Sequence, residues 1–315
     1  MENFIESKTR ERLEDIAEEL DAYLRYFVKR KFDSFLVKPI VYSTLGNKKL
    51  IGSLLILIGE LLGGNRDELL DIASAIELAC SASLIQGDII NGLKMRNDKE
   101  TVWAKYGVDV ALLLSHIMVS AGVLIIARKG DWLAKFVIDA WRRASIGNYL
   151  DTLYKRSVTL YKRSLERSVS YDEIIGLKTG SLFEAACFVG AGVVAGIDAA
   201  RAAGVYGYNI GCAYQVIDDL AGLSADKEEG GSTKLLELEG RGDAWDYGFK
   251  LAQLYLEQAT FAVDSLSGFT GQDVEILKYV PTILVKDLAK KGGRRFEDVI
   301  NSLLQNIVSK SQSSL

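Results

Sequence analysis

The scarcity of proline constrains this chain more than any other feature of its sequence. Its two prolines are Pro39 and Pro281, so the long stretch between them lacks the strongest helix breaker. Apolar residues recur every three to four positions through most of the chain, and few segments alternate with a period of two. These patterns predict an all-α fold. Over residues 9–35 they predict one amphipathic helix that ends at Pro39 and buries Leu13, Ile16, Leu20, Leu24, Phe27 and Val28.

Length and composition indicate one large globular domain. Of the 315 residues, 49% are apolar and 25% are charged, which suffices for a sizeable core. We expect this domain to cover residues 1–308 and to be followed by a disordered tail over residues 309–315. The apolar segment 108–127 contains Asp109, Ser115 and Ser120, so we expect a core helix of a bundle there and no transmembrane segment.

Charge and cysteine usage narrow the classes of function. The formal charge of −4 gives no general attraction to nucleic acid, so nucleic acid is not expected as a partner. The three cysteines, Cys80, Cys187 and Cys212, lie in apolar stretches without metal-ligand spacing, and we expect buried thiols in a reducing compartment. No N-terminal segment has the pattern of a signal peptide. Together these features predict a cytoplasmic protein.

Two adjacent aspartates, Asp218 and Asp219, lie inside an apolar run with helical periodicity. Gln215 precedes them by three and four residues, which places its amide and the two carboxylates on one helical face. Burying two carboxylates side by side is costly unless a cation compensates them, and Mg²⁺ binds such carboxylates together with phosphate oxygens. The stretch is consistent both with a metal–phosphate site and with a turn of helix that faces water.

Lysines at two places could hold the anionic part of such a ligand. Lys48 and Lys49 follow a Leu-Gly-Asn turn and precede an apolar helix, whose free N–H groups favour phosphate. Two solvated lysines are the more frequent outcome of such a pattern. Lys178 stands alone among small and apolar residues, where its charge needs an anionic partner.

The order and spacing of several motifs resemble the trans-polyprenyl diphosphate synthase family over nearly the whole chain. The matching segments are Lys178-Thr179, Tyr214-Gln215 followed by Asp218-Asp219, Gly147-Asn148-Tyr149-Leu150-Asp151, Ser83-Leu84-Ile85 before Asp88, and Arg96 with Thr101 after it. The resemblance implies the isoprenoid synthase fold, a single large helical bundle around a central cleft. It also implies condensation of isopentenyl diphosphate with an allylic diphosphate, in which Mg²⁺ held by two Asp-rich motifs neutralises the leaving diphosphate.

The resemblance also assigns roles to individual residues. It places catalysis on Asp88, Lys178, Asp218 and Asp219. It places metal binding on Asp88, Asn91 and Asp218. The residues that would bind the substrates are Lys48, Lys49, Arg96, Lys178, Thr179, Tyr214 and Gln215.

The helix before the first motif implies a long product. In the family a bulky aromatic residue about one turn before this motif closes the tunnel for the growing chain. Here the corresponding positions and the turns before them hold Ile76, Ala79, Ala82 and Ser83. We therefore expect an open apolar channel that accepts chains of about twenty carbons or more.

The chain departs from the family pattern at the motifs that bind metal. The first motif reads Gly87-Asp88-Ile89-Ile90-Asn91, and the second reads Asp218-Asp219-Leu220-Ala221-Gly222. Three carboxylates remain of the six expected, so we predict a weakened Mg²⁺ site held chiefly through Asp218. The basic segment of the family is reduced to Lys48-Lys49 followed by Ile51. After the first motif, Asn97 stands where the family has a second arginine, and the loop after Gly222 lacks the family's Gly-Lys step.

Two classes of function follow from these departures. One is a divergent trans-prenyltransferase that works with fewer metal ligands or on a different diphosphate. The other is a catalytically impaired or silent subunit that keeps the core and pairs with an active synthase of the same fold. A diphosphate-dependent terpene cyclase is a third alternative. We expect a homodimer or a heterodimer with an active paralogue, because segment 108–127 has more apolar surface than one side of a bundle needs.

Overall fold

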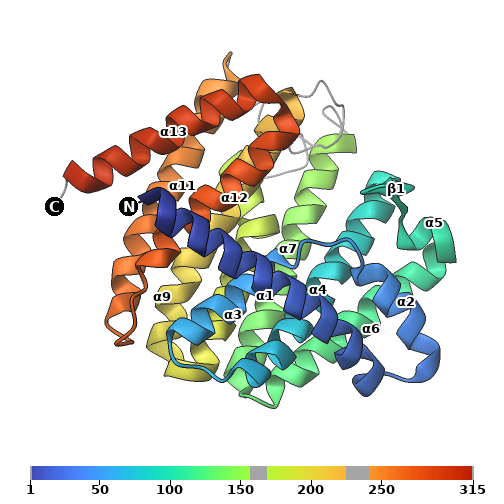
Figure 1. The fold of residues 1–315 in the computed structure, drawn as a ribbon. Helices are drawn as coiled ribbons and strands as arrows, with labels where there is room; N and C mark the ends of the chain where they lie inside the picture. Colours follow the sequence, from blue (N-terminus) through green and yellow to red (C-terminus); the bar gives the residue numbers. More distant parts are fainter. Residues whose placement is uncertain (1, 157–168, 225–241, 314–315) are drawn as a thin grey trace. The chain divides into compact units, whose positions relative to one another are not determined.

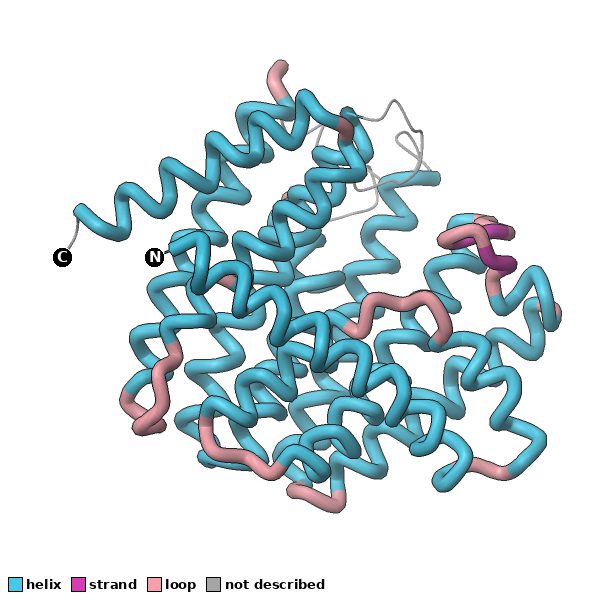
Figure 2. Tube along the Cα trace, viewed as in Figure 1, coloured by secondary structure: helices cyan, strands magenta, loops and turns pink. Residues whose placement is uncertain are grey.

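The computed structural model describes residues 2–156, 169–224 and 242–313, most of which are helical (Figure 1). Figure 2 shows the helices joined by short loops, with one small pair of strands. The all-α fold predicted from the sequence is confirmed. The elements in chain order are α1 (Glu2–Lys31), α2 (Ser34–Thr44), α3 (Leu50–Leu61), α4 (Arg66–Asn91), β1 (Met95–Arg96), β2 (Lys99–Glu100), α5 (Val102–Tyr106), α6 (Val108–Ala127), α7 (Asp131–Arg156), α8 (Tyr171–Ile175), η1 (Gly176–Gly180), α9 (Ser181–Ser224), α11 (Ala244–Ser267), η2 (Glu275–Lys278), α12 (Val280–Ala289), η3 (Lys290–Gly292) and α13 (Arg294–Ser313).

The chain divides into two compact units. The single domain over residues 1–308 stays a prediction. Unit 1 comprises residues 1–10, 140–184 and 202–315, and unit 2 comprises residues 11–139 and 185–201. Three helices, α1, α7 and α9, pass from one unit into the other. Within α9 the backbone leaves helical geometry at Gly196, whose φ is 82°.

Two helices, α3 and α4, supply much of the core of unit 2. Residues 54–58 of α3 are at most 1% exposed, which explains why this helix is apolar on all sides. Glycines permit close packing around it. A Cβ added at Gly190 of α9 would lie 2.5 Å from the Leu55 carbonyl oxygen, and one at Gly122 of α6 would lie 2.6 Å from that of Ala75. The missing side chains thus let α9 approach α3 and let α6 approach α4.

The first helix buries the face that the sequence predicts. All six of its predicted core residues are buried, namely Leu13, Ile16, Leu20, Leu24, Phe27 and Val28. The predicted end of this helix is wrong. Instead, α1 ends at Lys31, because Asp33 takes an extended backbone (ψ 147°), and Pro39 lies inside α2. There the proline removes one backbone hydrogen bond without ending the helix.

Unit 1 has its core around the C-terminal part of α9. Buried residues of α9 pack there with residues of α8, α11, α12 and α13; those on α8 and α9 are Tyr171, Ile174, Ile175, Cys212, Ala213, Val216, Ile217, Leu220 and Ala221. The N-terminal residues of α1 belong to this unit. Arg10 and Glu6 form ion pairs with Asp287 and Lys286 of α12, at 2.7 and 2.8 Å.

Smaller predictions of the sequence have mixed outcomes. The three cysteines are free; Cys187 and Cys212 are buried as predicted, whereas Cys80 is half-buried. Helix α13 continues to Ser313 and so covers residues 309–313 of the predicted disordered tail; residues 314–315 lie outside the described residues. Most of the loop after Gly222 in which the family's Gly-Lys step is missing, residues 225–241, is also outside them.

Two helical stretches, Val108–Ala127 and Tyr171–Ser224, are long and apolar enough to cross a membrane. Core helices of large bundles pass the same test of length and composition. Of the most apolar window in each stretch, 39% and 61% of the residues are buried inside the protein. The expectation that segment 108–127 is a core helix stays a prediction.

We expect Gly122→Ala to destabilise unit 2. The new methyl group would press on the Ala75 carbonyl, and overpacking of this kind costs about 1–3 kcal/mol. Gly87→Ala is the matched control, because no atom lies within 4 Å of a Cβ at this helical position. There alanine should stabilise the helix by about 0.5–1 kcal/mol. Urea unfolding measures both changes, and equal stability of the two variants would contradict the packing of α6 on α4.

Candidate functional site

A π-helical turn, η1, carries the Lys178-Thr179 motif of unit 1 between α8 and α9. Such widened turns occur frequently at functional sites. The Lys178 Nζ lies 2.8 Å from Oδ2 of Asp151, whose side chain is only 3% exposed. Gly147 makes this approach possible, since a Cβ there would lie 2.5 Å from the Lys178 backbone nitrogen. The anionic partner that the sequence requires for Lys178 is therefore Asp151 of α7.

The carboxyl group of Asp219 is buried at the centre of a polar network in unit 1. The Tyr171 hydroxyl donates to its Oδ2 at 2.7 Å, and the Gln215 amide donates to its Oδ1 at 3.0 Å. The Thr179 hydroxyl in turn donates to the Gln215 side-chain oxygen at 2.6 Å. Burial raises the pKa of Asp219 to about 7, although the Lys178 charge opposes this shift. Thr179, Gln215 and Asp219 of the predicted site are thus connected by hydrogen bonds.

Its neighbour Asp218 differs in exposure and in partner. Its side chain is 39% exposed, and its Oδ1 lies 2.8 Å from the Lys291 Nζ of η3. Tyr214, one turn earlier on α9, packs against Phe183, and burial together with the Asp218 charge raises its pKa. Lys291 was not predicted from the sequence, because 73 positions separate it from Asp218 and nothing in its local sequence marks it.

In unit 2 a hairpin positions Arg96. Strands β1 and β2 are joined by a two-residue turn in which Asn97 and Asp98 have φ of 49° and 58°. A type I′ turn needs this left-handed backbone at both positions, and asparagine and aspartate tolerate it well. The Nε and one terminal nitrogen of Arg96 both donate to one oxygen of Asp88, at 2.8 and 2.6 Å. Asn97, at the position where the resemblance implies a second arginine, is therefore a turn residue.

The first motif consists of one buried carboxylate and two neutral positions. Asp88 is 5% exposed, and burial raises its pKa despite the neighbouring Arg96 charge. The Asn91 amide donates to the Gly87 backbone oxygen at 2.8 Å, so it bonds to its own helix. Gly87 itself lies in open space. The structure thus brings Asp88 to Arg96, and Asn91 to the backbone of α4.

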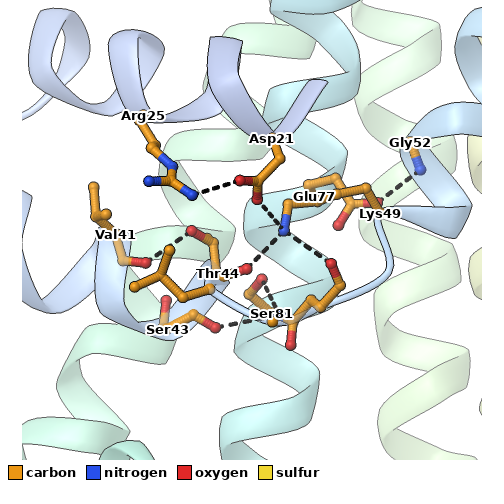
Figure 3. Close-up of polar contacts among 12 residues, drawn as sticks. Asp21, Arg25, Val41, Ser43, Thr44, Lys49, Gly52, Glu77 and Ser81 are labelled. Carbon is orange, nitrogen blue, oxygen red and sulfur yellow. Dashed lines mark hydrogen bonds and ion pairs between the residues drawn. The ribbon is translucent and has the colours of Figure 1, made fainter. Parts of the chain in front are cut away.

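Lys49 lies in the interior of unit 2 (Figure 3). Its side chain is 2% exposed, and its Nζ lies 2.8 Å from a carboxylate oxygen of Asp21 in α1. It also donates to the backbone oxygens of Thr44 and Asn47, at 2.6 and 3.1 Å. A buried ammonium needs such partners, and the donors of Lys49 are directed at them. The predicted contact of Lys49 with substrate stays a prediction. The neighbouring Lys48 is exposed, and its predicted role stays a prediction.

A second buried charge in this region, Glu77 of α4, was not predicted from the sequence. Its Oε1 accepts a hydrogen bond from the Gly52 backbone N–H at 2.7 Å, as Figure 3 shows. Burial raises the pKa of this carboxyl group. The signal available in the sequence was a single acidic residue inside an apolar helical run, residues 72–79.

The described residues do not fit the metal sites that the family implies. Among residues 2–156, 169–224 and 242–313 there is no group of three or more His, Cys, Asp or Glu side chains that could hold a metal ion. Asp88 is paired with Arg96, and Asp219 is enclosed by hydrogen-bond donors. Asp218 is the most exposed carboxylate of the two motifs. The weakened Mg²⁺ site stays a prediction, with Asp218 as its most accessible ligand.

The residues predicted to line the product channel lie on α4. Ile76, Ala79 and Ala82 are buried, and Ser83 is half-buried. A cavity of about 50 Å³ in unit 2 is lined from this helix by other residues, Ser81, Leu84, Ile85 and Asp88. The open channel along Ile76, Ala79, Ala82 and Ser83 therefore stays a prediction.

Known proteins match this chain in sequence and in fold. A family model described as polyprenyl synthetase matches residues 33–234, more than half of the chain. A geranylgeranyl diphosphate synthase from Sulfolobus acidocaldarius is 27% identical over 195 residues, which cover 59% of this chain and 57% of that protein. A hexaprenyl pyrophosphate synthase from Saccharolobus solfataricus is 25% identical over 279 residues, or 87% of this chain and 94% of that protein. The first of these relatives is thus matched over less than two thirds of its length.

Among solved structures, the geranylgeranyl pyrophosphate synthetase from Pyrococcus horikoshii aligns with a TM-score of 0.70. The alignment covers 88% of this chain and 99% of that one at 20% identity. At this identity the likeness shows the fold, which is the all-α fold of the isoprenoid synthases.

We expect Asp219 to lower the stability of the protein as the pH rises from about 4 to about 7. Its pKa is about 7 in the folded protein against 3.8 for the ordinary carboxyl group, so the folded state binds more protons in this window. Ionisation of the buried group then destabilises the fold by up to about 4 kcal/mol. Asp219→Asn should remove this component of the pH dependence.

Urea unfolding at several pH values measures the effect. Asp218→Asn is the matched control, because it removes the adjacent and more exposed carboxylate. If Asp219→Asn and the wild type lose stability equally over this pH range, Asp219 is not the group that titrates.

Proposed function

Because the chain belongs to the polyprenyl synthetase family, we propose that it is a divergent trans-prenyltransferase that condenses isopentenyl diphosphate with an allylic diphosphate. The observation that carries the proposal is that two basic residues of the family pattern are held by buried carboxylates. Arg96 is fixed by Asp88 in unit 2, and Lys178 is fixed by Asp151 in unit 1. Each unit thus presents a positioned cation for a diphosphate.

The proposed reaction needs such cations when the diphosphate leaves. The bond between the allylic carbon and the diphosphate oxygen breaks, and the double bond of isopentenyl diphosphate attacks the resulting carbocation. Negative charge develops on the leaving diphosphate, where preorganised donors stabilise the transition state. Arg96 can offer two N–H groups to a phosphate, whereas Lys178 acts as a point charge. Thr179 and Gln215 support this role of Lys178 by ordering the turn on which it lies.

A catalytically silent subunit of a heteromeric synthase is the second candidate. Two ion pairs favour this candidate, Arg96 with Asp88 and Lys291 with Asp218. The ionisation step of the family relies on metal bound at these carboxylates, and here each carboxylate is already paired with a basic side chain. Incubation with isopentenyl diphosphate and farnesyl diphosphate, followed by chromatography of the dephosphorylated products, separates the two candidates. A longer prenyl alcohol supports the transferase. No product, together with a rate increase in an active paralogue, supports the subunit.

We expect the double variant Gly87→Asp, Asn91→Asp to gain activity in the presence of Mg²⁺. The change restores two carboxylates one turn apart, and Gly87 has room for a side chain. Loss of one electrostatic stabiliser typically costs about a hundred- to a thousand-fold in rate, so we expect a gain of at least about tenfold in product formation.

Gly87→Asn alone is the control for this variant, since it adds the same bulk without charge. A folded double variant that binds diphosphate but gains no activity would place the defect elsewhere, at Lys49, Ile51 and Asn97. In the wild type we expect the binding of a diphosphate to depend only weakly on Mg²⁺, which calorimetry with and without the metal would measure.

We also propose that the protein forms a homodimer, or a heterodimer with an active paralogue, through α6. This helix exposes apolar side chains three turns apart, Leu113 at 64% and Leu124 at 66%. Exposed apolar faces of this kind mark interaction surfaces. We expect light scattering to give twice the chain mass for a homodimer, and Leu113→Lys with Leu124→Lys to reduce it to one chain mass. Phe261→Lys on α11 is the control, because Phe261 is an apolar side chain that is still more exposed, at 76%. A wild-type monomer without a recoverable partner would exclude this assembly.

A further inference from the structure

A lysine from the C-terminal part of the chain occupies the exposed side of the second motif. Lys291 lies on η3, the turn that follows α12, and its Nζ is 2.8 Å from Oδ1 of Asp218. This turn is fastened to the end of α9, because the Ser224 hydroxyl donates to the Gly292 backbone oxygen at 2.8 Å. The position of Lys291 beside the motif therefore follows from the fold of unit 1 and does not depend on the ion pair alone.

The preceding lysine of the same turn has a different partner. Lys290 lies 3.1 Å from Asp287, which also pairs with Arg10. Two adjacent lysines with similar exposure, 66% for Lys290 and 54% for Lys291, are thus directed to separate carboxylates. Lys291 is the one that lies at the second motif.

The ion pair between Lys291 and Asp218 can break when a more highly charged anion binds to Lys291. Both side chains are substantially exposed, and ion pairs of this kind contribute little to stability. A diphosphate carries more negative charge than one carboxylate and accepts several charge-assisted hydrogen bonds, so it can draw the ammonium group away from Asp218. A divalent metal ion would instead need the same Asp218 oxygen that Lys291 contacts.

We propose that Lys291 is a diphosphate-binding residue that competes with a divalent metal ion for Asp218. This inference rests on the proposed function to the extent that it takes a diphosphate as the ligand. In the free protein Lys291 neutralises Asp218, as a bound metal ion would. When a diphosphate binds in unit 1, Lys291 transfers its hydrogen bond from the carboxylate to a phosphate oxygen.

Two binding measurements on the full chain test the proposal. Calorimetry with inorganic pyrophosphate in EDTA measures metal-free binding, and electron paramagnetic resonance with Mn²⁺ alone measures metal affinity. We expect Lys291→Gln to weaken pyrophosphate binding about tenfold and to strengthen Mn²⁺ binding several-fold. Lys290→Gln, the matched control on the same turn, should change neither, and Lys291→Arg should retain pyrophosphate binding.

Different results would contradict diphosphate binding by Lys291 and its competition with metal at Asp218. If Lys291→Gln and Lys290→Gln bind pyrophosphate equally, or if the wild type binds none in EDTA, Lys291 is not a diphosphate-binding residue. If Lys291→Gln leaves Mn²⁺ affinity unchanged, there is no competition at Asp218. Neither measurement requires turnover, so a wild type that forms no prenyl product would overturn the proposed transferase and leave the role of Lys291 intact.

Discussion

Neutralisation of buried carboxylates determines how the functional regions of both units are built. An isolated carboxylate in the interior is too costly to persist, so each one needs a cation or several donors beside it. Oδ2 of Asp151 pairs with Lys178, and Asp88 pairs with Arg96, so each of these carboxylates fixes a basic residue of the predicted site. Asp219 is satisfied differently, by neutral donors and by a raised pKa that favours its protonated form.

The same constraint applies to the carboxylates of the two predicted motifs. A cluster of carboxylates that holds metal ions repels itself when the metal is absent. This chain has fewer carboxylates in its motifs, and the most exposed of them lies beside a lysine. Among the described residues, Asp88 and Asp218 are thus each paired with a cation of the protein itself.

The sequence predicted what depends on neighbours along the chain and missed what depends on distant contacts. The buried face of α1 was predictable because helical periodicity places its apolar residues on one side. The need of Lys178 for an anionic partner was predictable from the cost of its charge. The burial of Lys49 was not, because it depends on Asp21 from a different helix. The C-terminal end of the first helix was also predicted wrongly, because Pro39 lies inside α2 and does not end α1.

The backbone at Asn97 restricts which side chains this position can carry. Residues other than glycine, asparagine and aspartate pay roughly 1–2 kcal/mol in this left-handed conformation, where φ is 49°. An arginine at this position would strain the hairpin that aims Arg96 at Asp88. The turn and the aim of Arg96 are therefore coupled, because the residue at position 97 must tolerate a left-handed backbone for the hairpin to hold Arg96 against Asp88. The side chain at position 97 is thus selected for its backbone preference and not for its charge.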